Sequence, residues 1–163
     1  MENFSNYIVN ISNLKHNFKL IKSKLKPNVK ICAMVKADAY GHGLKDVCKA
    51  LNSVDFFGVA SVYEANKIRK FDAYTSILVV GTANLKQLLW CSLNNVSVEV
   101  SSVTELNNYI KFLDGQSLKV HIKVNTGLNG KPQSFCQPYK LNPHLTMPWQ
   151  KQGNIIDAKL LQQ

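Results

Sequence analysis

Between residues 14 and 124, amphipathic helical segments alternate with short apolar runs rich in β-branched residues, and this alternation constrains the fold most strongly. The pattern is typical of consecutive βα units around a parallel sheet. Strands are expected at 30–35, 56–60, 76–80, 96–100 and 118–124, and helices at 14–25, 44–51, 62–70, 84–93 and 103–113. Ser102 and Glu105 have the spacing of a capping box, which marks the start of the last helix.

Two α/β architectures fit this alternation, a doubly wound sheet and part of a (β/α)₈ TIM barrel. Hydrophobic periodicity does not distinguish them. A complete barrel needs about 250 residues and eight strands, whereas this chain has 163 residues. The second alternative therefore predicts a partial barrel of about five of the eight βα units.

The composition changes after Gly130. Residues 131–163 hold four of the five prolines and are rich in glutamine, and they lack core periodicity apart from a short helix expected at 155–161. This composition is typical of linkers, disorder or non-native sequence. We predict an α/β domain over 1–130 and an irregular or aberrant tail over 131–163.

Composition also argues against several classes of protein. No apolar run is long enough for a membrane span, and the first residues lack the apolar core of a signal peptide, so we expect a cytoplasmic protein that binds no membrane. The net charge is +10, but the basic residues are spread along the chain and only one of them is arginine. A clustered, arginine-rich surface of the kind that binds phosphates is therefore not expected, which disfavours nucleic-acid binding. The four cysteines are far apart, as expected of buried, reduced thiols and not of disulfides or a metal site.

Lys36 follows the apolar strand expected at 30–35, and small residues and glycines separate it from the next helix. In βα folds, functional groups gather where strands end. Tyr40 carries a hydroxyl that can donate to a phosphate, and Gly41 and Gly43 allow close backbone approach to an anion at the start of the next helix. The alternative is a solvated lysine before a tight βα turn, with His42 as a structural hydrogen-bonding residue.

The segment VKADAYGHG, residues 35–43, closely resembles the cofactor-lysine motif of alanine racemases, which are fold-type III pyridoxal-phosphate enzymes with a (β/α)₈ barrel. Further segments resemble this family in the expected order, and the resemblance runs from about residue 7 to residue 129. They are the helix with Asn17, the run 57–61 with Glu64 and Ala65 after it, the strand 77–80, and the segment 121–129.

The resemblance implies roles for three residues. Lys36 would hold pyridoxal 5'-phosphate covalently and act as one of two acid/base groups at the substrate α-carbon, and Tyr40 would bind the cofactor phosphate. Lys123 matches a position that can be carbamylated, although a strand-end lysine can equally pair with solvent or a nearby carboxylate. The implied reaction interconverts L-alanine and D-alanine for cell-wall precursors, in a family of homodimers.

Two positions depart from the family pattern. Asn125 stands where the family has aspartate, and Gly130 stands where it has arginine. The resemblance then stops before the last barrel strands and before the C-terminal β domain, which forms the dimer and supplies a tyrosine as the second base. We therefore expect a truncated racemase, impaired by itself. The alternatives are a non-catalytic module that binds the cofactor or a partner, and a racemase for serine or another small amino acid.

Overall fold

The computed structural model describes residues 8–123 and 138–141 of the chain. The chain forms two compact units, Met1–Ile77 and Leu78–Gln163. Strand β3 (Ser76–Val79) begins in the first unit and ends in the second. Among the described residues, no helix is long and apolar enough to cross a membrane.

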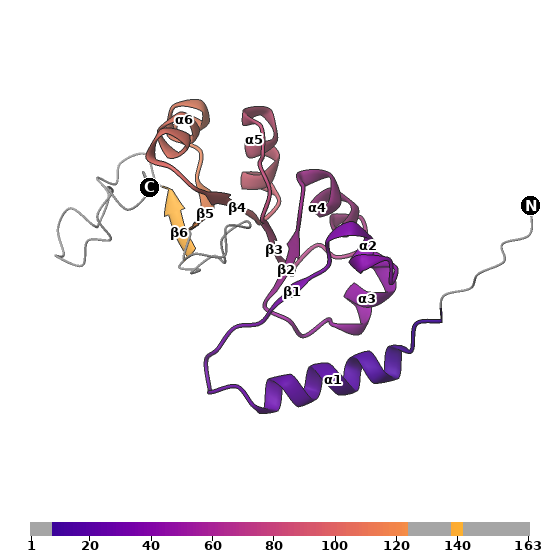
Figure 1. Ribbon diagram of the computed structural model, residues 1–163. Coiled ribbons are helices and arrows are strands. Elements are labelled where there is room, and N and C mark those ends of the chain that lie inside the picture. Colours follow the sequence, from indigo (N-terminus) through magenta and orange to yellow (C-terminus); the bar gives the residue numbers. More distant parts are fainter. Residues whose placement is uncertain (1–7, 124–137, 142–163) are drawn as a thin grey trace, which may run out of the picture. The chain divides into compact units, whose positions relative to one another are not determined.

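The first unit contains two further strands and four helices (Figure 1). Strands β1 (Cys32–Met34) and β2 (Phe56–Val59) pair in parallel, with Met34 opposite Gly58. The helical elements are α1 (Ile11–Ser23), α2 (Lys36–Tyr40), α3 (Leu44–Ala50) and α4 (Val62–Arg69). Helix α1 begins earlier than expected because the Asn10 side chain caps it by accepting from the Asn13 amide at 3.0 Å.

The second unit contains α5 (Leu85–Leu93), β4 (Val96–Val100), α6 (Val103–Leu113), β5 (Leu118–Ile122) and β6 (Pro138–Leu141). Both helices pack against β4, as Figure 1 shows. Strands β4 and β5 are parallel, whereas β6 pairs with β5 in antiparallel orientation. Strand β6 lies in the predicted tail, so that region is not irregular throughout, while the helix expected at 155–161 lies outside the described residues.

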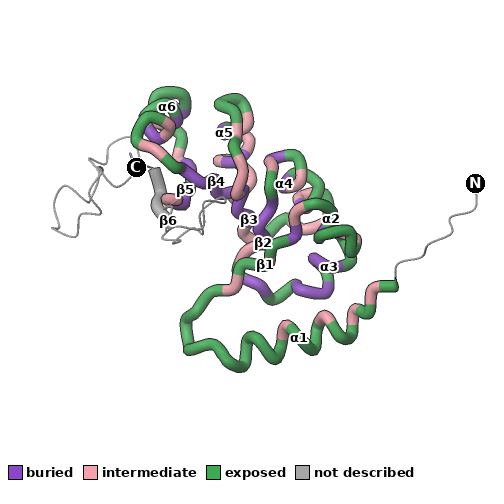
Figure 2. Tube along the Cα trace, viewed as in Figure 1, coloured by how far each residue is buried: buried purple, intermediate pink, exposed green. Residues whose placement is uncertain are grey.

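The core of each unit is built from its strands and the helix faces turned toward them (Figure 2). All five residues of β4 are buried, which requires cover on both faces of the strand. The largest fully buried apolar side chains include Phe57 and Ile68 in the first unit and Leu88 and Leu118 in the second. The order of strands and helices confirms the expected βα alternation in the described part of the chain.

The cysteines differ in exposure, and the expectation that the first three are all buried is wrong for one of them. Cys48 and Cys91 are buried free thiols, but Cys32 is exposed because β1 turns Cys32 and Met34 away from the core. Cys136 lies outside the described residues.

Burial raises the pKa of both the Cys48 and the Cys91 thiol to about 12, so at pH 8 both stay protonated and unreactive. Iodoacetamide at pH 8 is expected to alkylate Cys32 at least tenfold faster than Cys48 or Cys91, as measured by peptide mass spectrometry. In a denaturant the three rates should converge. Equal rates in the native protein would contradict the described burial.

Candidate functional site

The lysine of the predicted cofactor motif lies directly after the first strand. Val35 is fully buried and its amide donates to the Gly58 carbonyl at 2.8 Å, which continues the link between β1 and β2. Lys36 follows as the first residue of α2 and is half-buried. The backbone before the lysine is thus fixed by the sheet.

The backbone after Lys36 forms a left-handed turn, which the sequence analysis did not predict. Ala37, Asp38 and Ala39 have φ of 51°, 54° and 54°, and Tyr40 has φ of 56°. Each such residue costs roughly 1–2 kcal/mol relative to right-handed geometry. Strain of this kind persists only where surrounding contacts hold it, and it is concentrated at functional sites.

Local hydrogen bonds hold much of this turn together. The Ala39 amide donates to the Val35 carbonyl at 2.9 Å, and Asp38 Oδ1 accepts from the Leu44 amide at 2.8 Å. His42 Nδ1 lies 2.9 Å from the Ala39 carbonyl oxygen, which is the structural role considered for this histidine. Asp38 thus occupies the Leu44 amide, one of the N–H groups at the start of α3 that were expected to face an anion.

The geometry brings Lys36 and Tyr40 together. Lys36 Nζ lies 6.0 Å from the centroid of the Tyr40 ring, and the tyrosine is 57% exposed. A Cβ built on Gly41 or Gly43 meets no atom within 4 Å, so the space beside the turn is open, and both glycines are needed for their positive φ. An amine, a phenolic hydroxyl and open space fit a cofactor that carries both an aldehyde and a phosphate.

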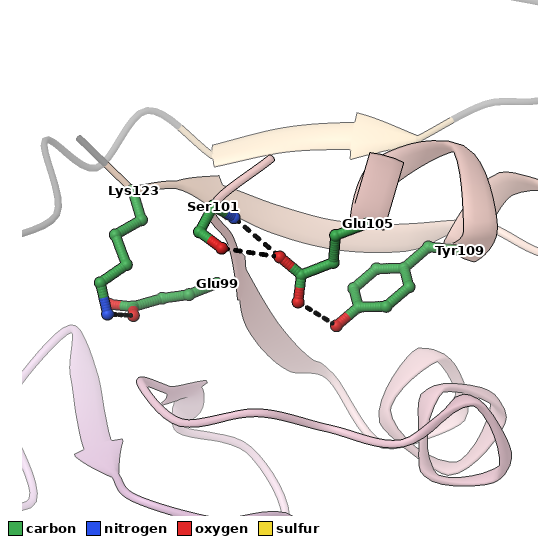
Figure 3. Close-up of polar contacts among 5 residues, drawn as sticks. All are labelled: Glu99, Ser101, Glu105, Tyr109 and Lys123. Carbon is green, nitrogen blue, oxygen red and sulfur yellow. Dashed lines mark hydrogen bonds and ion pairs between the residues drawn. The ribbon is translucent and has the colours of Figure 1, made fainter. Parts of the chain in front are cut away.

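Lys123 belongs to the second unit and lies beside an acidic side chain (Figure 3). Its Nζ is 2.9 Å from Glu99 Oε2, and the two side chains are only 11% and 6% exposed. They line a small cavity of about 60 Å³ together with Ser101 and Glu105. Lys123 was expected either to be carbamylated or to pair with solvent or a nearby carboxylate. The structure shows it paired with the carboxylate of Glu99, and carbamylation stays a prediction.

His121 is buried beside this pair. Burial lowers the pKa of its imidazole, and the negative charge of Glu99 opposes that shift. His121 is therefore neutral at pH 7. Glu99 and His121 could not be identified as site residues from the sequence, because polar residues in a buried strand carry no recognisable spacing signal.

The glutamate at residue 64 also went unrecognised as a site residue. Ser61 to Glu64 has the same Ser-Val-x-Glu sequence as Ser102 to Glu105, and in both cases the serine caps a helix by accepting from the glutamate amide. The shared spacing marks both glutamates as residues at the start of a helix, and only the fold brings Glu64 to the lysine turn.

Comparison with known proteins gives a consistent result. The family model for the alanine racemase N-terminal domain matches residues 9–131. The chain is 36% identical over 125 residues to alanine racemase 2 of Clostridium acetobutylicum. The matched region covers 74% of this chain and 32% of that protein. It is 40% identical over 123 residues to alanine racemase 1 of Caldanaerobacter subterraneus, covering 71% of this chain and 31% of the relative.

Solved structures agree with these relatives. The alanine racemase of Oenococcus oeni matches with a TM-score of 0.67 at 30% identity, over 76% of this chain and 36% of that one. That of E. faecalis matches with a TM-score of 0.71 at 26% identity, over 76% and 35%. The partial (β/α)₈ barrel predicted from the sequence is confirmed by this likeness. The chain spans about a third of the length of the relatives it matches, and it belongs to the alanine racemase N-terminal domain family.

Proposed function

We propose that the protein to which this chain belongs is a pyridoxal-phosphate-dependent racemase that interconverts L-alanine and D-alanine. The observation that carries the proposal is the half-buried Lys36 on a strained turn that also presents Tyr40 beside open space. Membership of the alanine racemase N-terminal domain family supports alanine as the substrate.

Lys36 Nζ would hold pyridoxal phosphate through a covalent bond to the aldehyde carbon, whose oxygen leaves as water, and the Tyr40 hydroxyl would donate to the phosphate. When bound, pyridoxal phosphate would withdraw electrons from the substrate α-carbon, which makes its proton removable. The Lys36 amine, freed when the substrate amine takes its place, would take or return that proton on one face. Inversion needs a second acid/base group on the opposite face, and in the family this group is a tyrosine from a C-terminal domain.

The same family membership supports a proposal about location and assembly. We propose a cytoplasmic enzyme that supplies D-alanine for cell-wall precursors and acts as a homodimer. Expression of the whole protein in a strain that requires D-alanine should restore growth. Growth restored only by a substrate other than alanine would favour a racemase for serine or another small amino acid.

Cofactor capture is the direct test of the site. The purified chain mixed with pyridoxal phosphate is expected to develop a visible absorption band, and borohydride should fix the label on one peptide, the one containing Lys36. Labelling spread over several exposed lysines would show ordinary surface modification and would refute the proposed site.

Activity distinguishes an enzyme from a cofactor-binding module. We expect the 163-residue polypeptide to capture the cofactor yet to racemise L-alanine no faster than buffer, because the proposed site has one acid/base group, Lys36, and inversion needs two. Racemisation is followed by chiral chromatography of alanine and of serine. Turnover well above buffer would show that a second base is present in this polypeptide.

A further inference from the structure

The carboxylate of Glu64, in the first turn of α4, connects two loops of the first unit. Its Oε1 accepts a hydrogen bond from the Ala37 amide at 2.8 Å, and its Oε2 accepts one from the Ala60 amide at 2.7 Å. Ala60 follows β2, and Ala37 is the residue directly after Lys36. One side chain therefore ties the lysine turn to the end of the neighbouring strand.

The second unit contains a glutamate at the corresponding position of a helix, with different hydrogen-bond partners. Glu105 holds the same position in α6, and its Oε2 accepts from the Ser101 amide at 2.9 Å and from the Ser101 hydroxyl at 3.0 Å (Figure 3). Its Oε1 accepts from the Tyr109 hydroxyl at 2.9 Å. Both glutamates thus accept, with one oxygen, from the amide of the residue before the capping serine, while the other oxygen has a backbone amide as partner in Glu64 and a side-chain hydroxyl in Glu105.

The position of Ala37 explains why its partner matters. Ala37 opens the left-handed turn, whose backbone bonds begin with donation from Ala39 to Val35. The Ala37 amide takes no part in those bonds and donates to Glu64 instead. Hydrogen bonds to an ionised acceptor are stronger than neutral ones, so Glu64 restrains the strained turn at the residue bonded to Lys36.

We propose that Glu64 is a positioning residue for Lys36: it locks the left-handed turn and thereby holds the lysine amine where the cofactor binds. The role in cofactor capture rests on the proposed function, whereas the restraint on the turn does not. The proposed role of Glu64 is exerted through the backbone, since its carboxylate accepts from the Ala37 and Ala60 amides.

The test compares Glu64→Gln with Glu105→Gln in the full chain. In Glu64→Gln the glutamine NH₂ must face one of two backbone amides that can only donate, so a hydrogen bond is lost. In Glu105→Gln the NH₂ can face the Tyr109 hydroxyl, which accepts as well as donates, so this variant should lose less stability. Only Glu64→Gln is expected to speed hydrogen exchange of the Ala37 amide at least tenfold, measured by NMR. It should also weaken the apparent affinity for pyridoxal phosphate at least tenfold, while Glu105→Gln changes either quantity less than twofold.

The two readouts separate the possible failures. If the unaltered chain captures no cofactor, the proposed function fails, and exchange at Ala37 still decides whether Glu64 restrains the turn. Unchanged exchange at Ala37 in Glu64→Gln, or equal loss of cofactor affinity in both variants, would overturn the positioning role. If Glu64→Gln does not fold, Glu64→Asp replaces it, since its shorter carboxylate cannot reach both amides and should also speed exchange at Ala37.

Discussion

Lys36→Ala is expected to abolish covalent capture of pyridoxal phosphate. The variant lacks the amine that bonds to the aldehyde, and no other described lysine shares the turn with Tyr40. Borohydride reduction followed by peptide mapping should find no label above that of a surface lysine. The fold should survive, because Lys36 is half-buried and its side chain is not part of the core.

Two control variants sharpen this prediction. Lys45→Arg changes an exposed lysine of α3 in the same unit and should leave cofactor capture unchanged. Lys36→Arg keeps the positive charge beside the Tyr40 ring but cannot form the covalent bond, and should therefore behave like Lys36→Ala. Capture that persists in Lys36→Ala would place the attachment site elsewhere.

Lys123→Met is expected to lower the free energy of unfolding by about 3–5 kcal/mol, because it leaves the charge of Glu99 buried without its cation. A loss of this size is a large fraction of the roughly 5–15 kcal/mol that stabilises a typical domain. Urea unfolding followed by circular dichroism measures it. The double variant Glu99→Leu with Lys123→Met should recover most of the loss, since apolar replacement of a buried pair is often neutral.

The same experiment bears on the predicted carbamylation of Lys123. A carbamate would place a second negative charge beside Glu99, so removing it would relieve repulsion and not create an uncompensated charge. A higher free energy of unfolding in Lys123→Met than in the unaltered chain would therefore contradict an ion pair between Lys123 and Glu99. A carbon-13 NMR signal from labelled bicarbonate, lost in the same variant, would establish the modification directly.

The sequence predicted the order of strands and helices because buried β-branched runs and helix caps are local signals. It failed at the lysine turn, where Ala37 and Ala39 show no preference for positive φ, and the conformation depends on Glu64, which lies 27 residues from Ala37. The pair of Lys123 and Glu99 was also out of reach, since these residues meet only through the pairing of β4 and β5. Contacts between neighbouring strands leave no spacing pattern in the chain.

The left-handed turn also has a consequence for which mutations the protein can accept. At residues 37–40 a β-branched side chain would collide with its own backbone, so valine, isoleucine and threonine are excluded there even where there is room for them. Glycine would relieve the strain but would also free the backbone beside the reactive amine. A residue of inverted chirality at position 37 or 39, introduced by chemical synthesis, would fit the turn without strain, so this stretch is built as the mirror image of an ordinary helix.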